Sequence, residues 1–396
     1  MQQQHREQRL STGVILLIIV LAQFFGTSVW FATNAVLGEI TALYDLPADA
    51  LGILTSSVQF GFILGTLIFA LLQLADRFPP SRVFFFCALA AAASNLAVLR
   101  ADGFTSLLLL RSLTGISLAG IYPVGMKIAA DHHEKGLGRA LGFLVGALVI
   151  GTSFPHLLKA FTGLFNWEAV LVWTSVLAAA GGILIMLLVP DGPYRKPGSR
   201  IRIGAVYQVF RIPDFKAAAF GYFGHMWELY TFWAFVPVIL ATYRDSHSGV
   251  DWPVPLLSFL IVFAGFPACV AGGYISGYLG SFRTARAALF ISMLCCLGSP
   301  VFFALPPGVF LVLLVLWSMA VITDSPQFST LVANAAPAES RGTALTMVNC
   351  LGFSITIISI MAMTWLKSLV PAEKLYVFLA AGPVLGLLAM RRASTR

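Results

Sequence analysis

Charged residues are scarce in this chain of 396 residues: they make up 11% of it, against 58% hydrophobic residues. A soluble protein carries about a quarter charged residues, so one large soluble core is excluded. The apolar residues fall in blocks of about 20, the length at which a helix crosses a bilayer. These blocks lack the ~10-residue alternation of an outer-membrane barrel. The sequence therefore predicts an all-α polytopic membrane protein.

Several kinds of chemistry lack their usual residues. The five cysteines all lie within apolar blocks, which indicates packing residues and neither a disulfide framework nor a metal site. A phosphate-binding loop of the Walker type is absent, which argues against ATP-driven transport by this chain. No nucleophile constellation or metal-ligand spacing stands out. We therefore expect a protein that is not an enzyme and that uses no metal and no cofactor.

Twelve apolar runs are candidates for membrane spans. The first follows a short polar stretch, is too long for the core of a signal peptide and precedes no convincing cleavage site, so we expect an uncleaved first helix. The predicted spans are 12–36, 51–74, 83–99, 104–127, 140–161, 168–189, 215–241, 255–279, 286–304, 309–331, 343–366 and 375–390.

The basic residues are distributed unevenly between the two sides of the predicted membrane. With both termini in the cytoplasm, 19 Lys and Arg residues lie on the inner side and 5 on the outer side. This is the positive-inside pattern, and it predicts a multi-pass protein of the cytoplasmic (inner) membrane. The formal net charge of +8 is then a consequence of topology, so nucleic acid is not an expected partner.

One long polar stretch, "PDGPYRKPGSRIRIGAVYQVFRIP" (190–213), divides six spans from six. It predicts a six-helix bundle over 1–189, a cytoplasmic loop over 190–213 and a second six-helix bundle over 214–396. The halves also repeat: "LQLADRFPPSR" after the second span corresponds to "GYISGYLGSFR" after the eighth, and "GRALG" corresponds to "GTALT". Two pseudo-symmetric bundles in parallel repeat are typical of one class of secondary transporters.

These features resemble the major facilitator superfamily over nearly the whole chain. The most specific part is the loop after the second span, where Asp76, Arg77 and Arg82 match the family pattern and Leu72, Pro79 and Ser81 depart from it. The resemblance implies that Asp76, Arg77 and Arg82 form a cytoplasmic latch that stabilises one state of an access cycle. The alternative is a solvated loop that carries positive-inside charges.

The fourth and fifth spans bear on the kind of transporter. "RSLTG" is similar to an antiporter-type pattern of the family, with Arg111 and Gly115 matching and Thr114 in place of Gln. In the fifth span Phe154 and Pro155 stand where the drug/proton antiporters have Gly-Pro, which argues against drug efflux.

The stretch "GHMWELY" places two titratable residues, His225 and Glu228, inside the seventh span. Residues three apart share a helix face. Histidine changes charge near neutral pH, and ionisable residues inside a membrane are costly and usually functional. The pair suits a proton relay. The alternative is a hydrogen-bonded pair that holds helices together.

Polar residues also form stripes in the first and fourth spans. Gln23, Trp30 and Asn34 lie on one face of a continuous helix, where they either line a substrate cavity or form interhelical hydrogen bonds. Arg111 begins a similar stripe that includes Tyr122. Its guanidinium either binds an anionic substrate or the Glu228 carboxylate, or extends to the headgroups.

Asp324 lies in the inner part of the tenth span and has no acidic counterpart in the first half. It is either a second proton site, the partner of a cation across the cavity, or a gating or packing residue.

Together these patterns predict secondary active transport of a small anionic or zwitterionic solute by proton-coupled symport. The expected substrate-binding residues are Gln23, Trp30, Asn34, Arg111, Tyr122 and Tyr230. The expected proton-coupling residues are His225, Glu228 and Asp324. The alternatives are a proton-coupled antiporter that exports an amphipathic drug-like compound, and a transporter-like receptor that moves no solute. The expected partners are the solute, protons and the lipid bilayer, and we expect a monomer.

Overall fold

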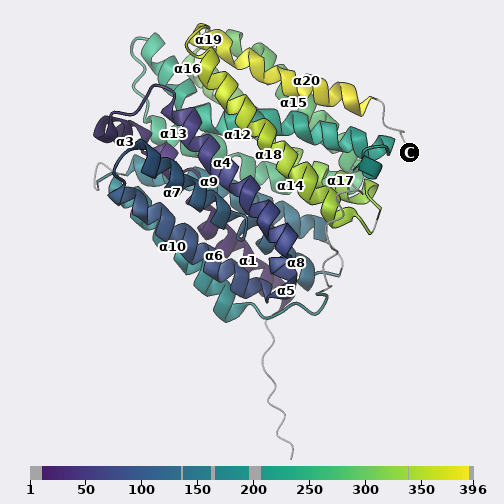
Figure 1. Ribbon diagram of the computed structural model, residues 1–396. Helices are drawn as coiled ribbons and strands as arrows, with labels where there is room; N and C mark the ends of the chain where they lie inside the picture. The colour runs from purple at the N-terminus through teal and green to yellow at the C-terminus, as the bar shows by residue number, and fades with distance from the viewer. Residues whose placement is uncertain (1–10, 135–136, 162–165, 196–206, 338, 392–396) are drawn as a thin grey trace, which may run out of the picture.

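The structure is a computed structural model that describes residues 11–134, 137–161, 166–195, 207–337 and 339–391 (Figure 1). All regular structure among these residues is helical. The part of the predicted central loop at 196–206 lies outside the described residues.

The first half of the chain forms the helices that Figure 1 draws in purple and blue. They are α1 (Thr12–Thr27), α2 (Ala32–Ala35), α3 (Leu37–Tyr44), α4 (Ala50–Leu72), α5 (Leu74–Arg77), α6 (Pro80–Ala97), η1 (Val98–Arg100), α7 (Phe104–Leu118), α8 (Tyr122–His132), α9 (Leu137–Ala160) and α10 (Glu168–Leu188).

The second half forms the teal, green and yellow helices. They are α12 (Pro213–Ser246), α13 (Val254–Phe263), α14 (Gly265–Leu279), α15 (Ser281–Phe302), α16 (Pro307–Thr323), α17 (Ser325–Ala335), α18 (Arg341–Leu366), α19 (Ala372–Leu375), η2 (Tyr376–Ala380) and α20 (Ala381–Met390).

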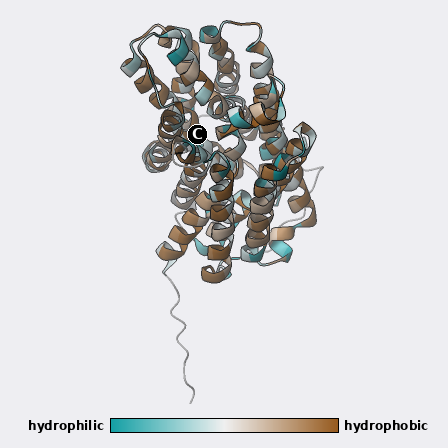
Figure 2. Cartoon of the chain, turned by 90° about the vertical axis from the view of Figure 1, so that its left-hand side faces the viewer, coloured by the Kyte–Doolittle hydropathy of each residue, from teal (hydrophilic) through white to brown (hydrophobic). Residues whose placement is uncertain are grey.

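The predicted all-α polytopic fold is confirmed. Each predicted span corresponds to one helix or to a short run of consecutive helices. Ten of these stretches are long and apolar enough to cross a membrane, and the other two predicted spans correspond to α1 with α2 and to α12. Side chains such as Leu187 (75% exposed) and Phe86 (64%) lie on the outside. Apolar residues run along the helices, as expected for a surface in contact with lipid (Figure 2).

Four spans that the hydropathy predicts as continuous are interrupted, which corrects the expectation of unbroken helices. The interruptions lie between α1 and α2, between α7 and α8, at Ala264 between α13 and α14, and at Asp324 between α16 and α17. Three of the helices that follow a break carry a proline in their first turn, at Pro123, Pro267 and Pro326. Proline lacks the amide N–H of a continuous helix and interrupts its hydrogen bonds.

The two halves lie side by side in Figure 1, and α4 packs along α18 where they meet. Helix α9 of the first half packs on α13 and α14 of the second. Close approach depends on small residues at the crossings. A Cβ atom on Gly52 of α4 would lie 2.3 Å from Oγ1 of Thr364 on α18, so the glycine makes room for the threonine side chain at this contact between the halves.

Candidate functional site

His225 and Asp324 meet in the interior of the second half. His225 lies on α12, and its Nδ1 atom is 2.7 Å from Oδ1 of Asp324. Both residues are buried, with 1% and 0% of their surface exposed. The contact is an ion pair when the imidazole is protonated. The structure thus places Asp324 beside a residue that is a cation only when it is protonated, and the role of Asp324 stays a prediction.

The interruption of the tenth span positions Asp324. The residue ends α16 and precedes α17, and its own carbonyl accepts a hydrogen bond from the amide of Phe328 at 2.9 Å. Discontinuous helices at the membrane midplane are the elements from which many transporters build their binding sites. The carboxylate therefore lies at the break between α16 and α17 and not within a continuous helix.

Glu228 has a separate set of partners. Its Oε1 atom accepts hydrogen bonds from Ser292 Oγ at 2.5 Å and Cys296 Sγ at 3.1 Å on α15, and from Trp317 Nε1 at 2.6 Å on α16. The residue is fully buried, and Oε2 has no hydrogen-bond partner among the described residues. His225 and Glu228 therefore have different partners in the structure, and the relay between them stays a prediction.

Arg111 supports the interruption of the first span. Its Nη1 atom donates to the carbonyl oxygen of Val29 at 3.2 Å, and Nη2 donates to that of Trp30 at 2.5 Å. The break between α1 and α2 leaves these carbonyls without helical partners, and in a membrane such groups must be satisfied internally. Arg111 is fully buried, so it does not extend to the headgroups. The sequence left open a contact between Arg111 and the Glu228 carboxylate. In the structure, Arg111 binds the two backbone carbonyls instead.

Asn95 on α6 connects this arginine to the rest of the first half. Its Oδ1 atom accepts from Arg111 Nη1 at 3.4 Å, and its amide nitrogen donates to Thr174 Oγ1 and Ser175 Oγ of α10, each at 3.0 Å. The sequence analysis did not identify Asn95. The sequence signal that could have identified it is a polar amide side chain within an otherwise apolar run.

An aromatic cluster joins the two halves. Trp30 stacks on Tyr230 with ring centroids 5.6 Å apart and on Phe353 of α18 at 6.0 Å. Phe62 of α4 lies 4.5 Å from Phe353, and Trp233 lies 5.3 Å from Tyr230. Trp30 and Tyr230 were predicted to face one cavity, and the structure brings them together. Phe62 and Phe353 were missed because an apolar run hides individual phenylalanines.

Several buried polar atoms have no hydrogen-bond partner among the described residues. They include both amide atoms of Gln23 and of Gln59, the indole nitrogens of Trp30 and Trp233, and Nε2 of His225. Buried polar groups in proteins are normally paired, so unpaired ones call for water or a ligand. Gln59 lies one turn from Phe62 on α4, and Trp30 and Trp233 belong to the aromatic cluster, so several of these atoms lie in that cluster or next to it.

The two other predicted substrate-binding residues, Asn34 and Tyr122, differ in their surroundings. Asn34 on α2 donates to Thr55 Oγ1 of α4 at 2.7 Å, which is the interhelical hydrogen bond that the sequence left as an alternative. Tyr122 begins α8 after the break in the fourth span and is partly exposed. Within the described residues, no group of three His, Cys, Asp or Glu side chains is placed to hold a metal ion.

The model of the Major Facilitator Superfamily matches residues 19–361. This chain belongs to the Major Facilitator Superfamily.

Sequence relatives match only parts of this superfamily member. The inner membrane transport protein YnfM of Escherichia coli K12 is 27% identical over 108 residues, 27% of this chain and 26% of that protein. The uncharacterised MFS-type transporter YybF of Bacillus subtilis 168 is 25% identical over 118 residues, 29% of each chain. The matches therefore span less than a third of the length of these relatives.

Solved structures of low sequence identity share the fold of the whole chain. A bacterial homologue of the human lysosomal transporter Spinster, in an inward-facing and unoccupied conformation, has a TM-score of 0.71 at 15% identity and covers 97% of this chain and 99% of its own. The human organic anion transporter MFSD10 has a TM-score of 0.73 at 14% identity, with coverages of 96% and 100%. The superfamily fold is thus confirmed across both halves.

The loop after the second span, which carries the superfamily pattern, forms ion pairs within the first half. Asp76 on α5 lies 3.0 Å from Nζ of Lys127 on α8, and Arg195 donates to the carbonyl oxygens of Asp76 and Phe78. Arg77 and Arg82 are exposed and form no ion pair with another described residue. Of the predicted latch residues, Asp76 alone contacts a neighbouring span.

Proposed function

We propose that this superfamily member is a secondary transporter that couples uptake of a small anionic or zwitterionic solute to proton movement. The observation that supports this best is the buried contact between His225 and Asp324, at 2.7 Å on two different spans. The halves would move against each other around the interior that lies between them.

The charge of the His225–Asp324 pair depends on one proton. A protonated imidazole beside a carboxylate is neutral overall, whereas a neutral imidazole leaves a buried carboxylate uncompensated. An uncompensated charge in the membrane interior is costly. A state that keeps the pair buried must therefore hold it without net charge, whereas a state that opens it to water lets it exchange the proton with that side. This difference is the coupling that proton-driven transport needs.

The solute class follows from the unpaired donors. Trp30 and Trp233 present indole N–H groups, and Gln23 and Gln59 present amides, all buried and without partners among the described residues. These groups suit a solute with carboxylate or carbonyl oxygens. Arg111, the cation expected to bind an anion, already donates to Val29 and Trp30. Structural likeness at 14–15% identity shows the fold alone, so the class rests on the residues of this chain.

The test uses purified protein in liposomes loaded with a pH-sensitive dye and supplied with pools of organic acids, amino acids, sugars and cationic drugs. Acidification of the lumen by the acid or amino acid pool is expected. Asp324→Asn should lower that signal at least tenfold, because the isosteric amide cannot hold the charge of the pair. Thr323→Val is the matched control: its hydroxyl donates to the carbonyl oxygen of Met319 at 2.7 Å and, at 3.5 Å, to that of Ala268, but it carries no proton-dependent charge, and the signal should persist. An undiminished signal in Asp324→Asn would contradict the proposal.

The second candidate is an antiporter that exports an amphipathic compound in exchange for protons. The aromatic cluster of Trp30, Phe62, Tyr230, Trp233 and Phe353 favours it, because flat apolar molecules stack on such rings. The same assay separates the two functions: addition of the exported compound outside would make the lumen alkaline.

A further inference from the structure

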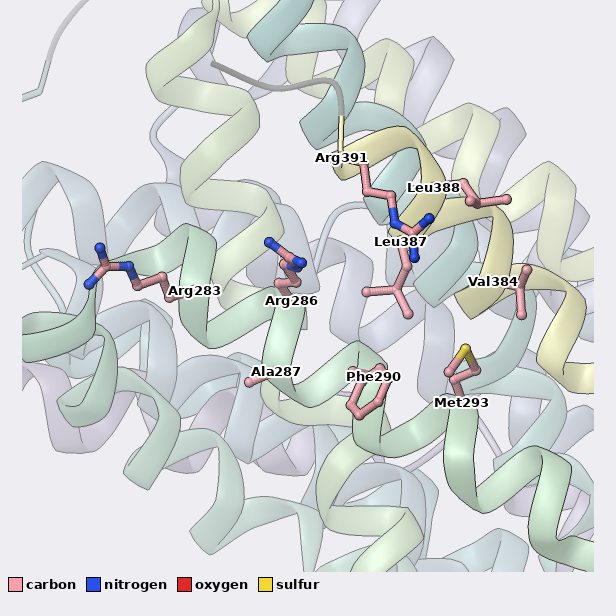
Figure 3. A pocket seen from close by; sticks show the side chains of 9 residues that line it. All are labelled: Arg283, Arg286, Ala287, Phe290, Met293, Val384, Leu387, Leu388 and Arg391. Carbon is pink, nitrogen blue, oxygen red and sulfur yellow. The ribbon is translucent and has the colours of Figure 1, made fainter. Parts of the chain in front are cut away.

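A groove of about 500 Å³ lies between α15 and α20, on the side of the second half away from the first (Figure 3). Its lining residues are Arg283, Arg286, Ala287, Phe290 and Met293 on α15, and Val384, Leu387, Leu388 and Arg391 at α20. None of them belongs to the site described above.

Each helix contributes one continuous face to this groove. On α15, the other lining residues lie three, four, seven and ten positions after Arg283. At α20, they lie three, four and seven positions after Val384. These are the spacings of a single helical stripe. The groove is therefore formed by the helices themselves and does not depend on a loop.

The cationic residues lie toward one end of the groove, where Arg286 and Arg391 flank it and Arg283 extends away from it (Figure 3). Arg283 and Arg286 lie in the first two turns of α15, and Arg391 follows the last residue of α20 (Figure 3). All three are exposed, and none forms an ion pair with an acidic residue in the described part of the chain. Their end of the groove is the one that the positive-inside count assigns to the cytoplasm.

The rest of the groove is apolar. Met293 lies seven residues beyond Arg286, or about 10 Å along the helix axis at 1.5 Å per residue. Phe290 (48% exposed) and Leu388 (46%) present their side chains to the outside. The groove thus begins at a cationic end and continues as an apolar channel toward the middle of the membrane.

We propose that this groove binds an anionic phospholipid of the cytoplasmic leaflet, with its headgroup at the end that carries Arg283, Arg286 and Arg391 and one acyl chain along Phe290, Met293 and Val384. Basic pockets between membrane helices on the cytoplasmic side suit anionic headgroups. A soluble phosphate would use the arginines and leave the apolar channel empty. A lipid matches both ends of the groove.

The lipid would hold together two helices that frame the site. Helix α15 carries Ser292 and Cys296, which donate to Glu228. Helix α20 packs directly on α12, where a Cβ atom on Gly224 would lie 2.4 Å from the carbonyl oxygen of Gly382. The binding proposal itself rests only on the groove and does not depend on the proposed transport function.

The test is native mass spectrometry of the delipidated full chain with dioleoyl phosphatidylglycerol, compared with dioleoyl phosphatidylcholine, which has the same acyl chains. The anionic lipid should bind more tightly, by roughly fivefold for each arginine that contributes. The variant R283Q/R286Q/R391Q should lose this preference, and the corresponding triple lysine variant should keep most of it. The control R211Q/K216Q/R341Q removes the same charge from exposed positions at the same end and should keep the preference.

Two further arms separate lipid from free phosphate. Glycerol 3-phosphate at millimolar concentration should not displace the lipid, and Met293→Trp, which fills the apolar channel, should weaken binding at least fivefold. Thermal unfolding identifies any variant that fails to fold. Equal binding of the two lipids by the wild type would overturn the proposal, as would equal loss in the control triple, displacement by glycerol 3-phosphate or unchanged binding in folded Met293→Trp.

Discussion

At the scale of single residues, the interior of the second half contains two separate acidic sites. Asp324 faces His225, whose protonation changes the net charge of the contact. Glu228 receives three donors on one oxygen and has its other oxygen unpaired among the described residues. Glu228 lies on α12, and Asp324 contacts His225 of the same helix. A conformational change in α12 would therefore affect both acids together.

Glu228→Gln tests whether the second acid also takes part in coupling. Glutamine keeps one acceptor oxygen for Ser292, Cys296 and Trp317, so the protein should fold, but the residue can no longer take up a proton. We expect proton-driven accumulation to fall at least tenfold while solute exchange at equal pH on both sides continues. Both are measured as uptake into liposomes. Accumulation at the wild-type level would show that Glu228 is a structural acceptor only.

At the scale of elements, the interrupted helices place the functional side chains. The break at Asp324 and the break between α7 and α8 lie in corresponding spans of the two halves. The break in the first span has no equivalent in α12, which runs unbroken over 34 residues. The free carbonyls of the first span are satisfied by Arg111, so this residue is part of the fold of the broken helix.

Arg111→Gln should therefore destabilise the protein without changing its selectivity for charge. The loss of donors leaves the carbonyls of Val29 and Trp30 buried and unpaired, at a cost of about 1–3 kcal/mol for each group. We expect a lower thermal unfolding temperature in detergent, and equal loss of affinity for an acidic and a neutral solute. Binding titrations check this. A much larger loss for the acidic solute would show that Arg111 binds the substrate.

At the scale of the whole molecule, the sequence predicted the architecture well because hydropathy and the distribution of basic residues follow directly from the bilayer. It did not predict the breaks within spans, since hydropathy averages over a window and does not register a single turn. His225 and Asp324 were each identified as costly charges, but their contact depends on how α12 packs against α16 and α17. Phe62 and Phe353 were not distinguished from lipid-facing phenylalanines, because only packing separates the two.

The close contact of Gly52 with Thr364 offers a test of movement between the halves, because α4 and α18 must separate there if that end of the molecule opens. In G52C/T364C the two sulfur atoms should form a disulfide on oxidation. Transport should stop and should return when a reductant is added.

The control S94C/T114C joins α6 to α7 within the first half, where the two native hydroxyls lie 3.1 Å apart, and should transport normally when oxidised. Cross-linking is measured by the loss of alkylation sites in intact-protein mass spectrometry. Full transport by completely cross-linked G52C/T364C would mean that this end stays closed throughout the cycle, and the two halves would then have to exchange access without separating at α4 and α18.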